Sequence, residues 1–184
     1  MTKLLPLIAF ALALALPGTA LAQSDTDTKT VSVVGTAPPM CFGGTLSGAG
    51  SFDLGVLIDT ATGQLRNDLN APPKLLVGSL CTSRSTITVS ATPLVAQNFT
   101  AAAPTGFAKA VDYTATASGW TTTPASYNTG AASNAAATQS RATAFTGDIT
   151  VAISGFATTG GNSLRLVADN DYRGLVTVTI AAVN

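Results

Sequence analysis

Few residues in this chain could do chemistry, because it has no His and its nine acidic side chains are all Asp. Without imidazole there is no Ser-His-Asp or Cys-His nucleophile pair and no His-based proton shuttle. Two Asp in one cleft could hydrolyse a glycosidic bond, but single Asp residues on strands and in turns are usually only solvated. We therefore expect no enzyme activity. The candidate pairs are Asp53 with Asp59 and Asp112 with Asp148.

One motif, Asp169-Asn170-Asp171, suggests a metal, since calcium takes carboxylate and carbonyl oxygens. No further acidic cluster accompanies it in the sequence, and a turn before the last strand accounts for the same residues. A zinc site is disfavoured because the two cysteines have no His to complete a ligand set. We expect neither a metal nor a cofactor.

The remaining composition describes a nearly uncharged protein. Of 184 residues only 10% are charged, the net charge is zero, and 32 Ala and 29 Thr make up a third of the chain. This balance argues against nucleic acid or an anionic membrane as a partner. A Thr/Ala surface lets crowded copies pack without charge repulsion, which suits a structural protein.

Residues 1–22 have the layout of a secretory signal peptide. Lys3 is followed by an apolar run over residues 4–16, and Ala20-Leu21-Ala22 is a small-x-small cleavage site. As a helix this run spans about 20 Å, too short for a ~30 Å hydrocarbon core. We predict cleavage after Ala22, a polar tail over 23–30, one domain over 31–184, and no membrane span in the mature chain.

The chain has two cysteines, Cys41 and Cys81. An even count in an exported chain favours a disulfide between them, with two buried free thiols as the alternative. By restricting the unfolded chain, a bridge closing a loop of this length stabilises the fold by roughly 4 kcal/mol.

Apolar and polar residues alternating with period two predict an all-β fold. Thr and Val are abundant, whereas Glu is absent and Lys is scarce, which favours strands over helices. Seven or eight short strands separated by Gly, Pro, Asn and Asp predict a β-sandwich of about seven strands with an aliphatic core. The expected strands are 30–37, 51–57, 74–80, 85–91, 110–117, 148–156, 163–167 and 175–183.

Residues 118–147 form a low-complexity insertion rich in Thr, Ala, Ser and Asn. Such a composition has little apolar area to bury, so the segment is either a long surface loop or a pair of weak edge strands. Its aromatic residues Trp120 and Tyr127 either pin it to the body or stack on a ligand.

The motifs around the two cysteines resemble those of chaperone–usher pilus subunits. TVSVVGTAPPMC ends at Cys41, FDLG follows from Phe52, and LCTSRSTITVS carries Cys81. Pro38-Pro39 and the closing segment DNDYRGLVTVTIAA are similar to the spore-coat-U-like, archaic branch of that superfamily. The resemblance covers most of 30–91 and 163–183.

This resemblance implies an immunoglobulin-like sandwich that lacks its final strand. A periplasmic chaperone lends a strand to the groove, and at the outer-membrane usher the N-terminal extension of an identical or related subunit replaces it. The chain is then a polymer subunit, exported via the periplasm to a surface fimbrium. Carried onto this sequence, Val176, Val178 and Ile180 line the groove, and Cys41 and Cys81 clamp the first two strands.

The N-terminus departs from the family pattern. A donor strand carries alternating apolar residues, but residues 23–30 are wholly polar. Val31 and Val33 therefore serve either as donor residues or in the domain's own first strand. The alternative function is a self-contained secreted β-sandwich that binds a surface or a glycan through the loop around Trp120 and Tyr127.

Overall fold

The computed structural model describes residues 26–183, so the expected signal peptide and its cleavage site lie outside the described residues. The chain divides into two compact units, residues 1–36 and 37–184. The described part of the first unit contains no strand, and its Val31 and Val33 side chains are 83% and 95% exposed. The strand expected over 30–37 is therefore absent, since alternation alone supplies no neighbour to pair with.

The second unit is built almost entirely of strands. Within 26–183 the single helix is a 3-10 turn at Ala135–Ala137, and no helix there is long and apolar enough to cross a membrane. A sheet of nine strands has the order β1-β3-β9-β6-β4-β11, with β2 on β3, β7 on β6 and β8 on β4. These strands are β1 (Cys41–Phe42), β2 (Thr45–Leu46), β3 (Lys74–Cys81), β4 (Ser85–Ala96), β6 (Ala110–Ser118), β7 (Ala125–Asn128), β8 (Thr138–Arg141), β9 (Phe145–Thr158) and β11 (Tyr172–Ala182).

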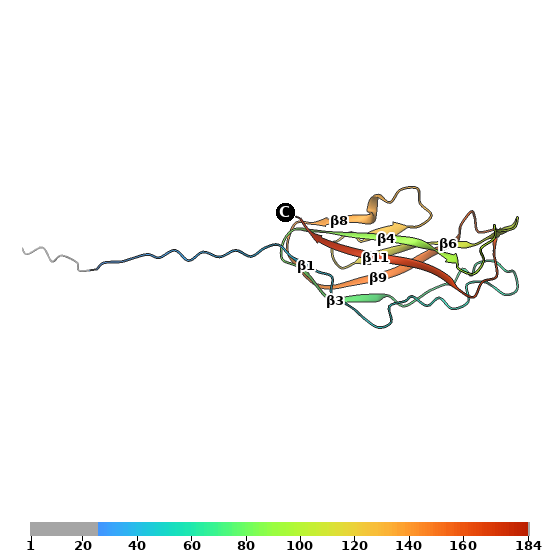
Figure 1. Ribbon diagram of the computed structural model, residues 1–184, viewed down its shortest axis with the longest axis horizontal. Helices are drawn as coiled ribbons and strands as arrows, with labels where there is room; N and C mark the ends of the chain where they lie inside the picture. The colour runs from blue at the N-terminus through green and yellow to red at the C-terminus, as the bar shows by residue number, and fades with distance from the viewer. Residues whose placement is uncertain (1–25, 184) are drawn as a thin grey trace, which may run out of the picture. The chain divides into compact units, whose positions relative to one another are not determined.

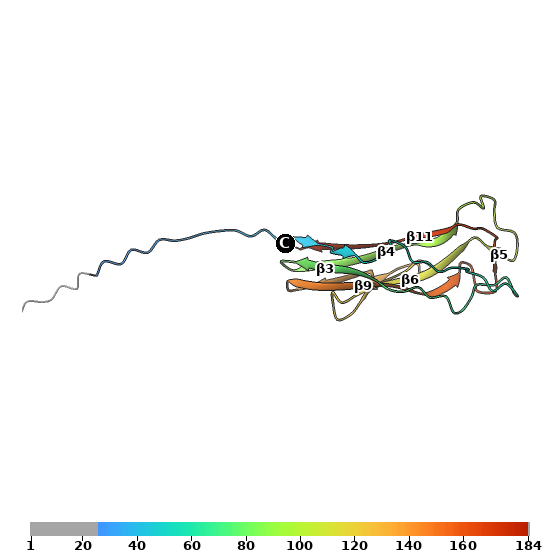
Figure 2. The ribbon, with the colours of Figure 1, turned by 90° about the horizontal axis from the view of Figure 1, so that it is seen from below.

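The antiparallel sheet curls into two layers (Figure 2). β4 and β6 pair only through Leu94 with Val111 and Val95 with Ala110, and the sheet bends at this short junction. One layer then contains β3, β9 and β6, and the other contains β4 and β11. The predicted all-β sandwich is confirmed. A separate parallel pair, β5 (Phe107–Ala108) with β10 (Arg165–Leu166), lies outside this sheet.

Most of the expected strands in the second unit form, whether they were predicted from alternation or from a short apolar run. β3, β4, β6, β9 and β11 contain the predicted ranges almost entirely. The strand expected over 51–57 is absent: the Gly55 N–H donates to Asp53 Oδ1 at 2.9 Å, and Gly55 has a φ of +63°, so a turn interrupts the extended chain. The strand expected over 163–167 shortens to β10. The insertion over 118–147 contains the short edge strands β7 and β8, which was one of its two alternatives.

The core lies between the two layers and is aliphatic, as expected. Most apolar side chains with no exposed surface come from β4, β6 and β9, because alternate residues of each strand point inward. The Cys41–Cys81 disulfide lies at one margin of this core and joins β1 to β3. The alternative of two free thiols is thus wrong. The fully buried apolar side chains are Ile87, Val89, Val111, Ala115, Trp120, Ala125 and Ile149.

Trp120 anchors the low-complexity insertion to the body. Its indole is completely buried, and its ring centroid lies 4.3 Å from that of Phe145 at the start of β9. The Arg141 guanidinium lies 5.0 Å from the Phe145 ring centroid and donates a hydrogen bond of 2.7 Å to the Trp120 carbonyl. The contacts among Trp120, Arg141 and Phe145 thus connect the two ends of the insertion.

We predict that Trp120→Ala lowers the free energy of unfolding by about 3–5 kcal/mol, as for other buried aromatic residues. Trp120→Phe should cost less, because it keeps a ring in the site and removes the buried indole N–H, which has no hydrogen-bond partner. Chemical denaturation of both variants measures the difference. Equal stability of Trp120→Ala and the wild type would show that the indole does not belong to the core.

Candidate functional site

The last strand, β11, has a neighbour on one side only. It pairs with β4 from Tyr172↔Ala96 to Ala182↔Ser85 and runs along the body beside it (Figure 1). Within 26–183 no strand pairs with its other edge. β1, at the opposite end of the curled sheet, comes close to β11 without pairing with it. The curl therefore leaves one side of the sandwich unclosed.

Burial changes sharply between β4 and β11, although the two strands are in register. Ile87 and Val89 of β4 have no exposed surface. Their direct cross-strand neighbours Ile180 and Val178 are only partly buried. Val176 is also partly buried, and all three side chains pack against the core cluster. The three predicted groove residues thus form an accessible strip of core along the unpaired edge.

Backbone groups along this edge also lack strand partners. The Val183 N–H donates to Arg84 O at 2.9 Å, and the Leu175 N–H donates to Thr92 Oγ1 at 2.9 Å, so odd-numbered residues face β4. Because the direction alternates along an antiparallel strand, the N–H and C=O groups of Val176, Val178 and Ile180 face the open edge. Such a row of unpaired groups is a template for another strand.

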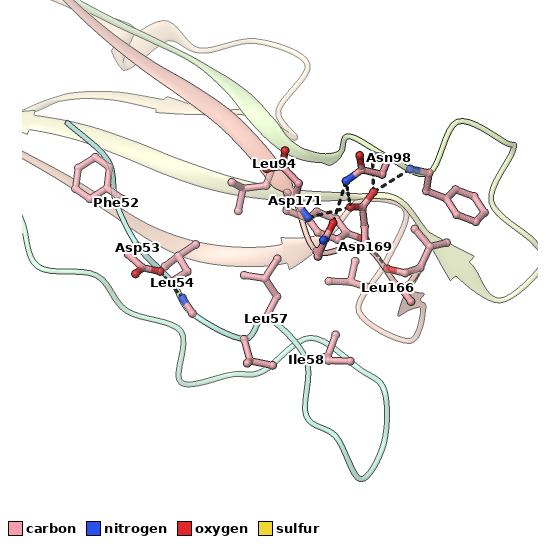
Figure 3. A pocket seen from close by; sticks show the side chains of 17 residues that line it. Phe52, Asp53, Leu54, Leu57, Ile58, Leu94, Asn98, Leu166, Asp169 and Asp171 are labelled. Atoms are coloured by element: carbon pink, nitrogen blue, oxygen red, sulfur yellow. Dashed lines mark hydrogen bonds between the residues drawn. The ribbon is translucent and has the colours of Figure 1, made fainter. Parts of the chain in front are cut away.

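A cavity of about 840 Å³ opens where β11 begins. Its apolar wall comes from the segment 52–58, which faces the end of β4 and the segment 166–172 across the cavity (Figure 3). Asn98, Asp169 and Asp171 contribute polar groups to the same lining. Polar and apolar groups thus share the lining of this cavity. Its main apolar residues are Phe52, Leu54, Leu57, Ile58, Leu94 and Leu166.

Asp169 stabilises the turn that borders this cavity. Its two oxygens accept four hydrogen bonds of 2.8–2.9 Å, from the Asn98 side chain and from the backbone N–H groups of Asn98, Phe99 and Asp171. Burial pushes the pKa of Asp169 upward, but these bonds outweigh it and lower the pKa from 3.8 to about 2. The Asp169-Asn170-Asp171 motif thus has the hydrogen bonds of a turn, and residues 26–183 contain no cluster of potential metal ligands.

The other acidic candidates also hold local structure. Asp148 accepts a hydrogen bond from the N–H of Gly78 at a bulge in β3. Asp112 accepts hydrogen bonds from the hydroxyls of Thr129 and Thr159. Asp53 and Asp59 each accept one from the N–H two residues later. Each of the four carboxylates therefore has a structural partner.

The aromatic residues of the insertion do not form a surface platform. Trp120 has no exposed surface, so its indole is not available for stacking on a ligand. Tyr127 is half-buried and packs against the core cluster. Both side chains therefore contribute to the packing of the insertion against the body.

Tyr113 is a residue of the site that sequence reasoning missed. It lies on β6, yet its hydroxyl donates a hydrogen bond of 3.1 Å to the carbonyl of Leu175 on β11. Burial raises the pKa of Tyr113 to about 12. A Tyr in an otherwise aliphatic inward row needs a polar partner, and that requirement was the available signal. The bond holds the start of β11 across the sandwich.

Comparisons with protein-family models, with curated proteins and with solved structures give no match. The structural features that bear on function are therefore the open edge, the partly buried strip and the adjoining cavity.

We predict that Asp169→Asn is less stable than the wild type at neutral pH, because an amide cannot accept all four hydrogen bonds. Since the folded-state pKa of Asp169 is lowered to about 2, its contribution is present above pH 3.8 and is lost as the pH falls towards 2. Thermal melts across this range should show a weaker pH dependence for Asp169→Asn. Asp171→Asn is the matched control, because its carboxylate pairs with exposed Arg173. Equal melts for wild type and Asp169→Asn at neutral pH would contradict this role.

Proposed function

We propose that this chain is a structural subunit of a surface pilus or coat, assembled by donor-strand exchange as in the chaperone–usher subunits it resembles. The supporting observation is the partly buried strip of Val176, Val178 and Ile180 beside an unpaired strand edge. A strand added at this edge would satisfy the exposed backbone groups. Its alternate side chains would cover the core.

The N-terminal segment is the proposed donor. Residues 26–36 contain no strand, and Val31 and Val33 are almost fully exposed. The eight residues 30–37 match the length of the regular β11 edge, residues 175–182. Pro38 and Pro39 follow, and two consecutive prolines do not continue a strand ladder. They separate the donor segment from β1, the first strand of the domain.

This arrangement would allow the chain to polymerise. Each copy carries one donor segment and one acceptor edge, and head-to-tail contacts between copies generate an open filament. Before assembly, the acceptor edge would be covered by a periplasmic chaperone and then passed to an outer-membrane usher. The Cys41–Cys81 disulfide is compatible with this export route, because disulfides persist in oxidising compartments.

We predict that Val178→Asp abolishes filaments and leaves export to the periplasm intact, because the groove would bury an unpaired carboxylate beside the donor strand. Thr179→Asp is the matched control: it adds the same charge to the exposed side chain of the next residue and should still assemble. Electron microscopy of surface filaments and immunoblots of the periplasm provide the readouts. Normal filaments in Val178→Asp would overturn the groove assignment.

A second prediction separates a pilus subunit from the alternative, a self-contained sandwich that binds a surface or glycan. Expressed alone, the exported chain should give little folded monomer, because its core is uncovered along β11. Co-expression with a cognate chaperone should give a stable one-to-one complex. Chromatography and thermal melting of both preparations test this. A soluble monomer with a cooperative melt in the absence of a chaperone would favour the alternative.

A further inference from the structure

The free edge of β11 lacks the features that usually prevent strands from pairing with copies of themselves. Natural edge strands carry Lys, Pro, inward charges or bulges. Residues 175–182, LVTVTIAA, contain no charge, Pro or Gly, and their register with β4 is regular. The bulge between Arg173 and Leu175 lies just before them. Nothing within this stretch opposes the approach of a second strand.

The other sheet edges are much shorter. β7 and β8 have four residues each, and β1 and β2 have two each. Short edges offer few hydrogen bonds and are a common protection against association. Among the described residues, β11 is therefore the edge best suited to pairing between copies.

The sequence of β11 is complementary to itself in one antiparallel register. A two-fold axis at Val178 places Val176 opposite Ile180 of a second copy and Thr177 opposite Thr179. Within residues 176–180 the inward residues then meet only aliphatic residues, and the outward residues meet only hydroxyls, both of which are favourable cross-strand pairs. Because the N–H and C=O of Val178 face the open edge, the two copies of Val178 would form a hydrogen-bonded pair.

We propose that, when no donor strand covers it, β11 pairs with β11 of a second copy to form a symmetric dimer centred on Val178. Such an interface uses the same patch on both copies, so it closes at two and does not extend. The dimer occupies the edge that a donor strand would need, and it therefore holds the chain in an assembly-incompetent state. The pairing itself needs only the free edge of β11, whereas its consequence for assembly rests on the proposed function.

Two double variants test the register. In Thr177→Lys/Thr179→Lys, like charges would lie directly opposite each other on both sides of the axis. In Thr177→Lys/Thr179→Asp, each Lys would lie opposite an Asp. Both double variants change the exposed residues Thr177 and Thr179 and leave the inward residues unchanged. In the proposed register these are non-hydrogen-bonded pairs, whose side chains lie closest together.

The full exported chain, refolded with its disulfide intact and without a chaperone, is examined by sedimentation velocity over a range of concentrations. The wild type and the Lys/Asp variant should be dimers. The Lys/Lys variant should dissociate with a Kd at least about tenfold higher, since like charges directly opposite destabilise strand pairs. Circular dichroism melts of the wild type and of both variants check that the substitutions leave the fold intact.

A monomeric wild type, aggregates larger than a dimer, or equal dimerisation of the two variants would overturn the proposal. The result is independent of the donor-strand hypothesis. If no dimer forms but Val178→Asp still abolishes filaments, only the inference about self-pairing fails. If the dimer forms and Val178→Asp filaments are normal, the proposed function fails instead.

Discussion

A sheet that curls without closing leaves edge strands with a single neighbour, and the longest of them among the described residues is β11. Its inward side chains pack against the core, yet they are only partly buried, whereas Ile87 and Val89, the partners of Ile180 and Val178 on β4, are fully buried. The unpaired edge of β11 therefore exposes both apolar side-chain area and backbone hydrogen-bonding groups. Donor-strand addition and self-pairing are two proposed ways of covering this edge of β11.

Several contacts hold the two sides of this opening in place. The Cys41–Cys81 bridge fixes β1 to β3 on one side, and the Tyr113 hydroxyl bonds to Leu175 on the other. Asp169 orders the turn beside the cavity through hydrogen bonds from residues far away in sequence. Because these contacts already order the residues around the opening, little further conformational entropy would be lost if another strand bound there.

The sequence pattern predicted the long strands well, because period-two alternation reports directly on which face is buried. It failed where a local turn competes with extension, as at Asp53 and Gly55. The disulfide partners followed from cysteine count and expected compartment. Val176, Val178 and Ile180 were named through a resemblance. Tyr113 and the partners of Asp169 were missed, because their contacts join residues about 60 and 70 positions apart.

By itself, the sequence predicted a β protein with a mainly aliphatic core and few charges, and it favoured one disulfide, because composition and residue alternation can be read without knowing which strands pair. Only the tertiary structure decided that Trp120 is buried, that the insertion forms edge strands, and that β11 has one free edge. Those outcomes depend on how the sheet curls and on which strands meet. Long-range pairing of this kind has no signature in the local residue pattern.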